Sequence, residues 1–407
     1  MTSIDDPATA AGRVERPLRS LAGTVYLPAT AYGIGQGAAA PVMVLSALEL
    51  GASAALAGLT VAIVGLGQVA GDTCSGQIVA KIGERRSIIV ASLLAASGAL
   101  ACLLAPAVWT LCLGIFAVGL ANAVWGLARQ NYLSLAVPFA WRARAMSLFG
   151  GAMRLGFFVG PLLGAGAIVV FGTRGGFLVQ LTAIVVAGSM MARLPDPPGA
   201  GPMVKSHNIS QVFAEHGRLL ATLGAGSLLL GVARSARDAI LPLWASHIGL
   251  SPAVASLLFG VGAAADVLFA YPAGHLMDRF GRTLVAVPSI VVLSVSYLLL
   301  PFTTTLFTFT AVAVVMGVGN GLGNGVIMTI GADVAPSTGR AEFLAAWRLT
   351  HDSGFLVGPL PIALSAAVFP LSAAVFAVAA LSGGGAVLLG KYVPEYTSMS
   401  SSTTRST

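Results

Sequence analysis

Hydrophobic residues along the 407-residue chain form long runs that short polar segments separate. Each run is close to the roughly 20 residues that an α-helix needs to cross a bilayer. None shows the alternation of apolar and polar positions typical of a membrane β-barrel, and lipid admits only helices or closed barrels. The pattern predicts an all-α membrane protein with twelve transmembrane helices. The runs cover residues 21–47, 54–79, 87–105, 109–133, 145–171, 176–194, 218–246, 252–276, 284–301, 306–330, 341–369 and 371–390.

Lysine and arginine residues indicate how these helices are oriented. If the N-terminus lies inside, sixteen of the 22 Lys and Arg fall on the inner side, and the outer loops contain only Arg174. The other five lie within apolar runs. Cytoplasmic loops are rich in Lys and Arg. We therefore expect a multi-pass protein of the plasma membrane with both termini in the cytoplasm.

The second half of the chain repeats the first. The stretch GFFVGPLLGA begins at Gly156, and GFLVGPLPIA begins 198 residues later at Gly354. Because six predicted helices separate the copies, both halves have the same orientation and form two parallel six-helix repeats. The same shift pairs Gly33 with Gly231, Gly51 with Gly249, Gly83 with Gly281, Gly119 with Gly317, Asn122 with Asn320, and Arg142 with Arg340.

The repeat divides the chain into five parts. Residues 21–194 form the first bundle and residues 218–390 the second. The segment 195–217 is rich in proline and glycine and is predicted to be a cytoplasmic linker. Residues 1–20 and 391–407 are the predicted cytoplasmic tails.

Composition excludes several classes of function. Charged residues make up 9% of the chain, against roughly 25% in a typical soluble protein. The net charge of +7 is spread between apolar runs, so it indicates membrane topology and no nucleic-acid partner. The three cysteines lie in apolar runs without CxxC spacing, which predicts no metal site. With no phosphate-binding loop and no catalytic constellation, we expect neither a cofactor nor an enzyme.

Two loops share a motif of the form Gly-x-x-x-Asp-Arg-x-Gly-Arg. The copy after predicted helix 8 contains Gly274, Asp278, Arg279, Gly281 and Arg282. The copy after predicted helix 2 retains Gly76, Lys81, Gly83 and Arg85, but has Ala80 in place of the aspartate. With the twelve-helix repeat, this motif resembles the major facilitator superfamily over nearly the whole chain. The resemblance implies a secondary transporter in which these loops form a latch that stabilises the outward-facing state.

The repeated glycine phrase also resembles a family motif, that of helix 5 in drug and metabolite antiporters. Small residues four apart let helices approach closely in lipid, and proline bends a helix. Helix packing is therefore the simplest reading of the phrase, whereas the resemblance implies export. Its residues are Gly156, Gly160, Pro161 and Gly164 in predicted helix 5, with Gly354, Gly358 and Pro359 in predicted helix 11.

Charged residues inside the apolar runs are the candidates for proton coupling, since each costs about 2.5–3.5 kcal/mol at a helix centre unless paired or hydrated. Asp72 and Arg129 lie at similar depths and could pair. Asp266 has no acid or base near it in sequence, so its partner must come from another helix. Arg234–Asp238 and Arg348–Asp352 are spaced to pair along one helix face. The candidates are Asp266, Asp238, Asp72, Asp352 and His351, and a static ion pair is the alternative role for each.

A second set of residues is predicted to line a substrate cavity. Arg129 and Arg154 are candidates for an anionic substrate group. The equivalence of Asn122 and Asn320 in the repeat favours hydrogen bonds between helices. Unlike the drug antiporters, predicted helix 1 has no acidic residue in mid-membrane. The full set is Gln36, Arg129, Arg154, Arg234, Asn122, Asn320 and Trp125.

Together these features predict a monomeric transporter that exports a small compound in exchange for protons. The polar side chains are few, which suits an amphipathic compound better than a sugar. A proton-coupled importer on the same fold is the first alternative. A non-transporting membrane receptor is the second.

Overall fold

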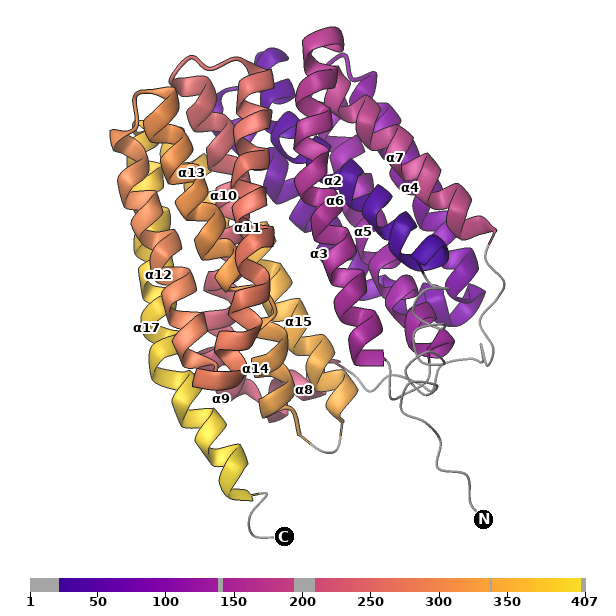
Figure 1. Ribbon diagram of the computed structural model, residues 1–407, viewed down its shortest axis with the longest axis vertical. Coiled ribbons are helices and arrows are strands. Elements are labelled where there is room, and N and C mark those ends of the chain that lie inside the picture. The colour runs from indigo at the N-terminus through magenta and orange to yellow at the C-terminus, as the bar shows by residue number, and fades with distance from the viewer. Residues whose placement is uncertain (1–21, 138–141, 194–208, 337–338, 404–407) are drawn as a thin grey trace, which may run out of the picture.

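The computed structural model describes residues 22–137, 142–193, 209–336 and 339–403, and this part of the chain is helical (Figure 1). The first half contains a short π-helix, Ala22–Tyr26, followed by α2 (Leu27–Glu49), α3 (Ala54–Ile82), α4 (Glu84–Leu103), α5 (Val108–Ala136), α6 (Arg142–Phe171) and α7 (Arg174–Ala192). The connecting segment forms α8 (Ile209–Glu215), α9 (Gly217–Leu219) and a π-helical turn, Leu220–Gly224. The second half contains α10 (Ala225–His247), α11 (Pro252–Phe280), α12 (Thr283–Leu299) with a 3₁₀ turn (Leu300–Phe302), α13 (Leu306–Leu322), α14 (Val326–Val334), α15 (Arg340–Val357), α16 (Pro359–Ala366) and α17 (Leu371–Thr403).

Eleven spans of the described chain are long and apolar enough to cross a membrane. The twelfth predicted span, 341–369, is divided into α15 and α16 at Gly358 because Pro359 has no N–H to continue the helix ladder. Gly358 keeps helical torsion angles, with φ −59° and ψ −42°, so the two pieces follow one another as a single interrupted span. The prediction of an all-α protein with twelve spans is therefore confirmed.

The two halves repeat the same local geometry. Gly83 and Gly281 end α3 and α11 with φ of 81° and 89°, values that favour glycine. At the other end of these two helices, Ser53 and Ser251 are equivalent N-caps. Equal backbone conformations 198 residues apart show that the sequence repeat is a structural repeat.

The repeated glycine phrase places two helix crossings in equivalent positions. A Cβ added to Gly156 in α6 would lie 2.9 Å from Gly33 Cα in α2. A Cβ added to Gly354 in α15 would lie 2.9 Å from the carbonyl carbon of Gly231 in α10. Both crossings are possible only because no side chain intervenes. The contact continues at Gly160 and Gly164 against Ala38, and at Gly358 against Ser235 and Val232.

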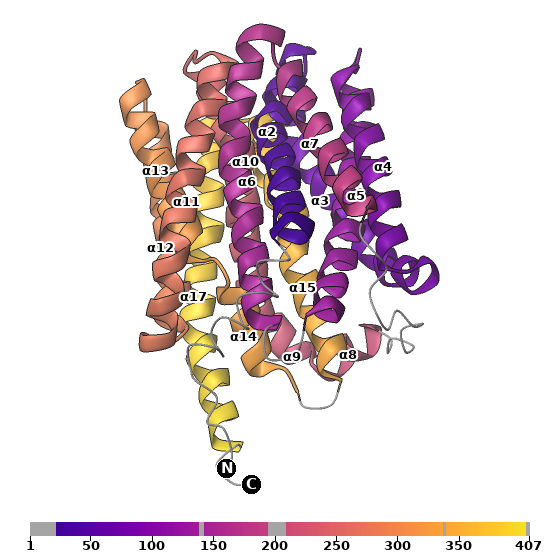
Figure 2. The ribbon, with the colours of Figure 1, turned by 45° about the vertical axis from the view of Figure 1, so that its right-hand side comes forward.

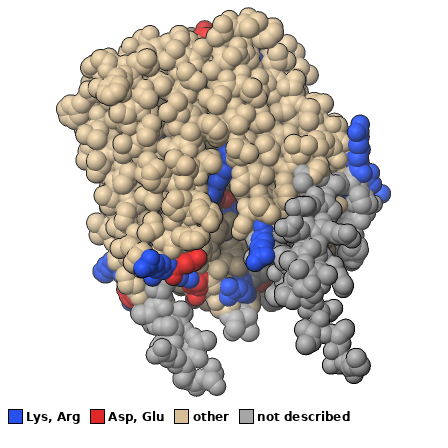
Figure 3. Space-filling model, viewed as in Figure 1, with Lys and Arg blue, Asp and Glu red and all other residues tan. Residues whose placement is uncertain are grey.

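The halves stand side by side as two bundles, α2–α7 and α10–α17 (Figures 1 and 2). They meet where α6 packs on α11 and α3 packs on α15 and α16. These contacts lie away from the end of the molecule that contains α14, which we call the α14 end: Ser256, near the start of α11, donates a 2.9 Å hydrogen bond to the carbonyl oxygen of Pro161. At the α14 end, Figure 3 shows a hollow between the bundles with charged side chains inside it.

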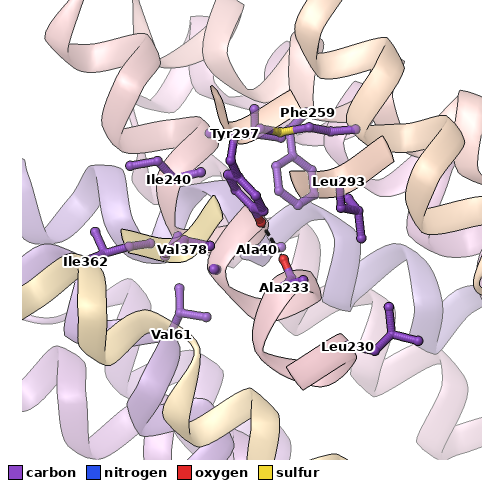
Figure 4. Close-up of a cluster of buried hydrophobic side chains, with 14 of the residues drawn as sticks. Ala40, Val61, Leu230, Ala233, Ile240, Phe259, Leu293, Tyr297, Ile362 and Val378 are labelled. Atoms are coloured by element: carbon purple, nitrogen blue, oxygen red, sulfur yellow. Dashed lines mark hydrogen bonds between the residues drawn. The ribbon is translucent and has the colours of Figure 1, made fainter. Parts of the chain in front are cut away.

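A buried apolar cluster holds the second half together and reaches across to the first (Figure 4). Tyr297 of α12 lies in this cluster and donates its hydroxyl hydrogen to the carbonyl oxygen of Ala233 in α10. Val61 of α3 and Ile362 of α16 belong to the same cluster. Apolar packing thus continues from the second half into the first.

Candidate functional site

A polar network surrounds Asp266 in the middle of α11. Asn320 Nδ2 of α13 donates to Asp266 Oδ2 at 2.6 Å, and Asn324 Nδ2 donates to Asp266 Oδ1. Asn324 lies in the turn between α13 and α14, where Gly325 adopts a φ of 79°. Both carboxylate oxygens thus accept hydrogen bonds from side-chain amides of the second half.

Arg234 of α10 completes this network. Its NH2 donates to the carbonyl oxygen of Asn320 at 3.0 Å and to Asn324 Oδ1 at 3.2 Å. The predicted Arg234–Asp238 pair is therefore wrong, because Asn320 at the end of α13 and Asn324 in the following turn accept from Arg234 instead. Asp238 instead lies 3.6 Å from the neighbouring Arg237.

Arg154 approaches the same network from the other half. It lies on α6 and interacts electrostatically with Asp266 across the interface of the bundles. Within the described residues, its guanidinium has neither a hydrogen bond nor an ion pair shorter than 4.0 Å. Arg154 is half-buried, so this cation lies between the halves with its donors unused.

The first half has its own polar group at the equivalent depth. Gln36 of α2 and Asn122 of α5 exchange hydrogen bonds of 2.9 and 3.2 Å, and Tyr32 donates to Asn122 Oδ1 at 2.5 Å. The 198-residue shift places Gln36 on Arg234 and Asn122 on Asn320. Asn122 and Asn320 thus join neighbouring helices, as the repeat predicted.

Arg129 of α5 is buried among aromatic rings. Its guanidinium lies 3.8 Å from the ring centre of Trp125 and 3.7 Å from that of Phe149, and the residue is 1% exposed. Neither Nε nor NH2 finds a hydrogen-bond partner in the described chain. The suggested Asp72–Arg129 pair is therefore wrong, because these rings enclose the guanidinium.

Asp72 of α3 faces the second half instead. It interacts electrostatically with Asp352 and Arg348 of α15. Arg348 Nε lies 3.2 Å from Asp352 Oδ2, which confirms the predicted pair, and Arg348 NH1 donates to Gln130 Oε1 of α5 at 3.4 Å. His351 is turned away from this group: its Nδ1 lies 2.9 Å from the carbonyl oxygen of Ser227 in α10.

The two loop motifs lie at the α14 end and differ in their contacts. Arg282 Nε lies 2.7 Å from Asp333 Oδ2 at the end of α14, and Arg85 NH2 donates to the carbonyl oxygen of Ala192 at 2.7 Å. Open space surrounds the positions of a Cβ on Gly76 and Gly274. The side chains of Lys81, Asp278 and Arg279 are exposed.

Sequence reasoning left three contributors out of the candidate sites. Asn324 was not among the candidates, although both its amide and that of Asn320 donate to Asp266. Arg237, which is 2% exposed, was not given a role because its neighbours could not be foreseen. Phe149 carries no signal in sequence. Among the described residues, no group of three or more His, Cys, Asp or Glu could hold a metal ion.

Comparisons with known proteins agree with this architecture. The family model described as Major Facilitator Superfamily matches residues 26–223 and 223–405. The chain is 25% identical over 223 residues to "Uncharacterized MFS-type transporter YcaD" of Salmonella enteritidis PT4, covering 54% of this chain and 56% of the relative. The protein of the same name from Escherichia coli O45:K1 is 26% identical over 234 residues, with the same coverage. The chain thus spans about half the length of these curated relatives.

Solved structures are similar over more of the chain. A POT family transporter in complex with 5-aminolevulinic acid has a TM-score of 0.74 at 12% identity, and the match covers 93% of this chain and 97% of that one. A D-xylose-proton symporter has a TM-score of 0.73 at 14% identity, with 91% and 98% covered. At such identities the likeness concerns the fold.

Proposed function

The chain belongs to the Major Facilitator Superfamily, and we propose on that basis that it moves a small amphipathic compound across the membrane by alternating access, coupled to protons at Asp266. We assign residues 21–194 and 218–390 to the two moving bundles and residues 195–217 to the linker. The excess of Lys and Arg supports a cytoplasmic α14 end with both termini. The described conformation then corresponds to the inward-open state of a monomer in the plasma membrane.

The position of Asp266 is the observation that supports proton coupling. Its carboxylate belongs to the second half, while Arg154 attracts it from the first. Adding a proton removes this attraction and frees Arg234 from its counter-charge. Protonation therefore changes the force between the two halves, as a coupling residue must. Asp238, Asp72 and Asp352 are further proton-binding candidates, and a static ion pair suits Asp352 best.

Two directions of transport are open to this mechanism. Export in exchange for protons is the first candidate, supported by the resemblance of the glycine phrase to the antiporter motif. The glycines of this motif pack helices closely in both halves. The motif is therefore weaker evidence for the direction of transport. Import together with a proton is the second candidate, favoured by the unused guanidinium of Arg154.

Everted membrane vesicles test this proposal. Respiration acidifies their interior, and a pH-sensitive dye reports proton release when a panel of amphipathic cations, neutral compounds and carboxylates is added. Exchange predicts proton release on adding a substrate, whereas symport predicts proton-driven uptake in right-side-out vesicles. The Asp266→Asn variant should abolish both signals, and Glu215→Gln, which changes an exposed carboxylate outside the spans, should not. Wild-type protein without any proton flux would favour the receptor alternative.

A further inference from the structure

The guanidinium of Arg154 is the least satisfied charge between the halves. An arginine carries five N–H donors, and the described residues occupy none of those of Arg154. Other arginines within the spans each contact a ring or a carboxylate: Arg129 lies between two rings, Arg237 lies beside Asp238, and Arg348 pairs with Asp352. We propose that Arg154 binds the carboxylate of the transported substrate, which is a small organic monoanion.

The charge balance of the cluster supports a ligand with one negative charge. Arg234 interacts electrostatically with Arg154, Arg237, Asp238 and Asp266. These five residues contribute three positive and two negative charges when ionised. One positive charge of this cluster therefore lacks a counter-charge. A monoanion in the cleft would restore neutrality.

The structural repeat does not require an arginine at position 154. The 198-residue shift places it on Asp352, a residue of opposite charge that forms a pair within its own helix. The glycine crossings are alike in both halves, so they need no arginine at this position. The charge of Arg154 thus serves something other than packing.

The surroundings of Arg154 indicate an acid with an apolar body. A carboxylate offers two oxygens that match the guanidinium fork, which gives a bidentate contact. Phe157 follows Arg154 on α6 and lies against Phe259 of α11, with ring centres 6.0 Å apart. Phe259 is buried, whereas Phe157 is partly exposed and lies one turn after Arg154 on the same helix face. A substrate with its carboxylate on Arg154 can therefore lay an aromatic or aliphatic part against the ring of Phe157.

The same geometry relates the anion to the proton. The charged groups that face Asp266 are Arg154 on α6 and Arg234 and Asp238 on α10, and the amides of Asn320 and Asn324 contact it. A proton on Asp266 removes the counter-charge of the arginines, and a bound anion can take its place. Proton and anion thus stabilise each other, which favours the symport candidate. This inference rests on the proposed function and names its substrate class.

A series of three matched probes tests the site: 1-naphthylacetate, 1-naphthylacetamide and 1-naphthylmethylamine. Binding to the purified full-length protein is measured by thermal stabilisation and isothermal titration. We expect the carboxylate to bind in preference to the amide and the amine. Arg154→Gln should weaken it by roughly tenfold to a hundredfold, the range for a hydrogen bond to a charged group. Arg154→Lys keeps the charge without the guanidinium fork, so its affinity for the carboxylate should lie between those of wild type and Arg154→Gln.

Arg174→Gln is the matched control, because Arg174 is an exposed arginine at the start of α7. Equal binding of the amide, no carboxylate binding to wild type, or unchanged binding to Arg154→Gln and Arg154→Lys would overturn the inference. A different result would contradict the proposed function. Proton coupling that persists in Asp266→Asn contradicts it, whatever the charge preference of the probes.

Discussion

Substituting Gly156 with leucine tests the helix crossing on which the repeat depends. A Cβ at Gly156 would lie 2.8 Å from Ile34 N and 2.9 Å from Gly33 Cα. Both are backbone atoms of α2, so a side-chain rotation cannot relieve the overlap. The carbonyl oxygen of Thr30 would lie closer still. Reaching ordinary contacts of about 3.5 Å therefore requires α2 and α6 to separate by more than roughly 0.7 Å before the rest of the side chain is added.

Overpacking of this kind costs about 1–3 kcal/mol, which corresponds to a fall in Tm of roughly 1–4 °C for a chain of this length. Thermal unfolding of the purified variant in detergent measures the loss. The matched control is Gly166→Leu on the same helix, where nothing lies within 4 Å of an added Cβ. Gly354→Leu should lose as much as Gly156→Leu, because its Cβ would lie 2.8 Å from Val232 N. If Gly156→Leu and Gly166→Leu unfold at the same temperature, the crossing is not as close as described.

Three further predictions use the same unfolding assay. Tyr297→Phe removes the hydroxyl that donates to Ala233, so stability should fall by about 0.5–1.5 kcal/mol; an unchanged Tm would show that this hydrogen bond contributes nothing. Asp333→Asn breaks a partly exposed ion pair with Arg282 and should cost less than about 1 kcal/mol, with the difference from wild type shrinking at high salt; a salt-independent loss would contradict this. Arg129→Met removes a buried cation that has two unpaired nitrogens, so the Tm should stay level or rise; a fall of several degrees would mean that the aromatic contacts outweigh the unpaired charge.

Much of the fold could be predicted because its determinants repeat at a fixed interval. Glycine at position 156 and again at position 354 indicates a close helix approach in both halves, and the contacts with Gly33 and Gly231 are of that kind. The division of the predicted span 306–330 into α13 and α14 was not foreseen. A hydropathy run does not register a single left-handed glycine such as Gly325.

The site was less predictable, because partners within a bundle depend on how each helix is rotated. Spacing along one helix identified the Arg348–Asp352 pair correctly. The same rule failed for Arg234, whose acceptors come from the end of α13 and the turn after it, 86 and 90 residues away. Similar depth also failed for Asp72 and Arg129, because depth does not reveal that Arg129 lies between Trp125 and Phe149.

The central claim is that the two halves move against each other under the control of Asp266, and pulsed electron spin resonance tests it directly. One pair of spin labels on Arg86 and Phe280 spans the α14 end, and a second on Arg174 and Thr304 spans the opposite end; all four residues are exposed. The account predicts that Asp266→Asn, which mimics the protonated form, shifts the two distances in opposite directions relative to wild type. Distances that stay fixed, or that change together in the same direction, would contradict it.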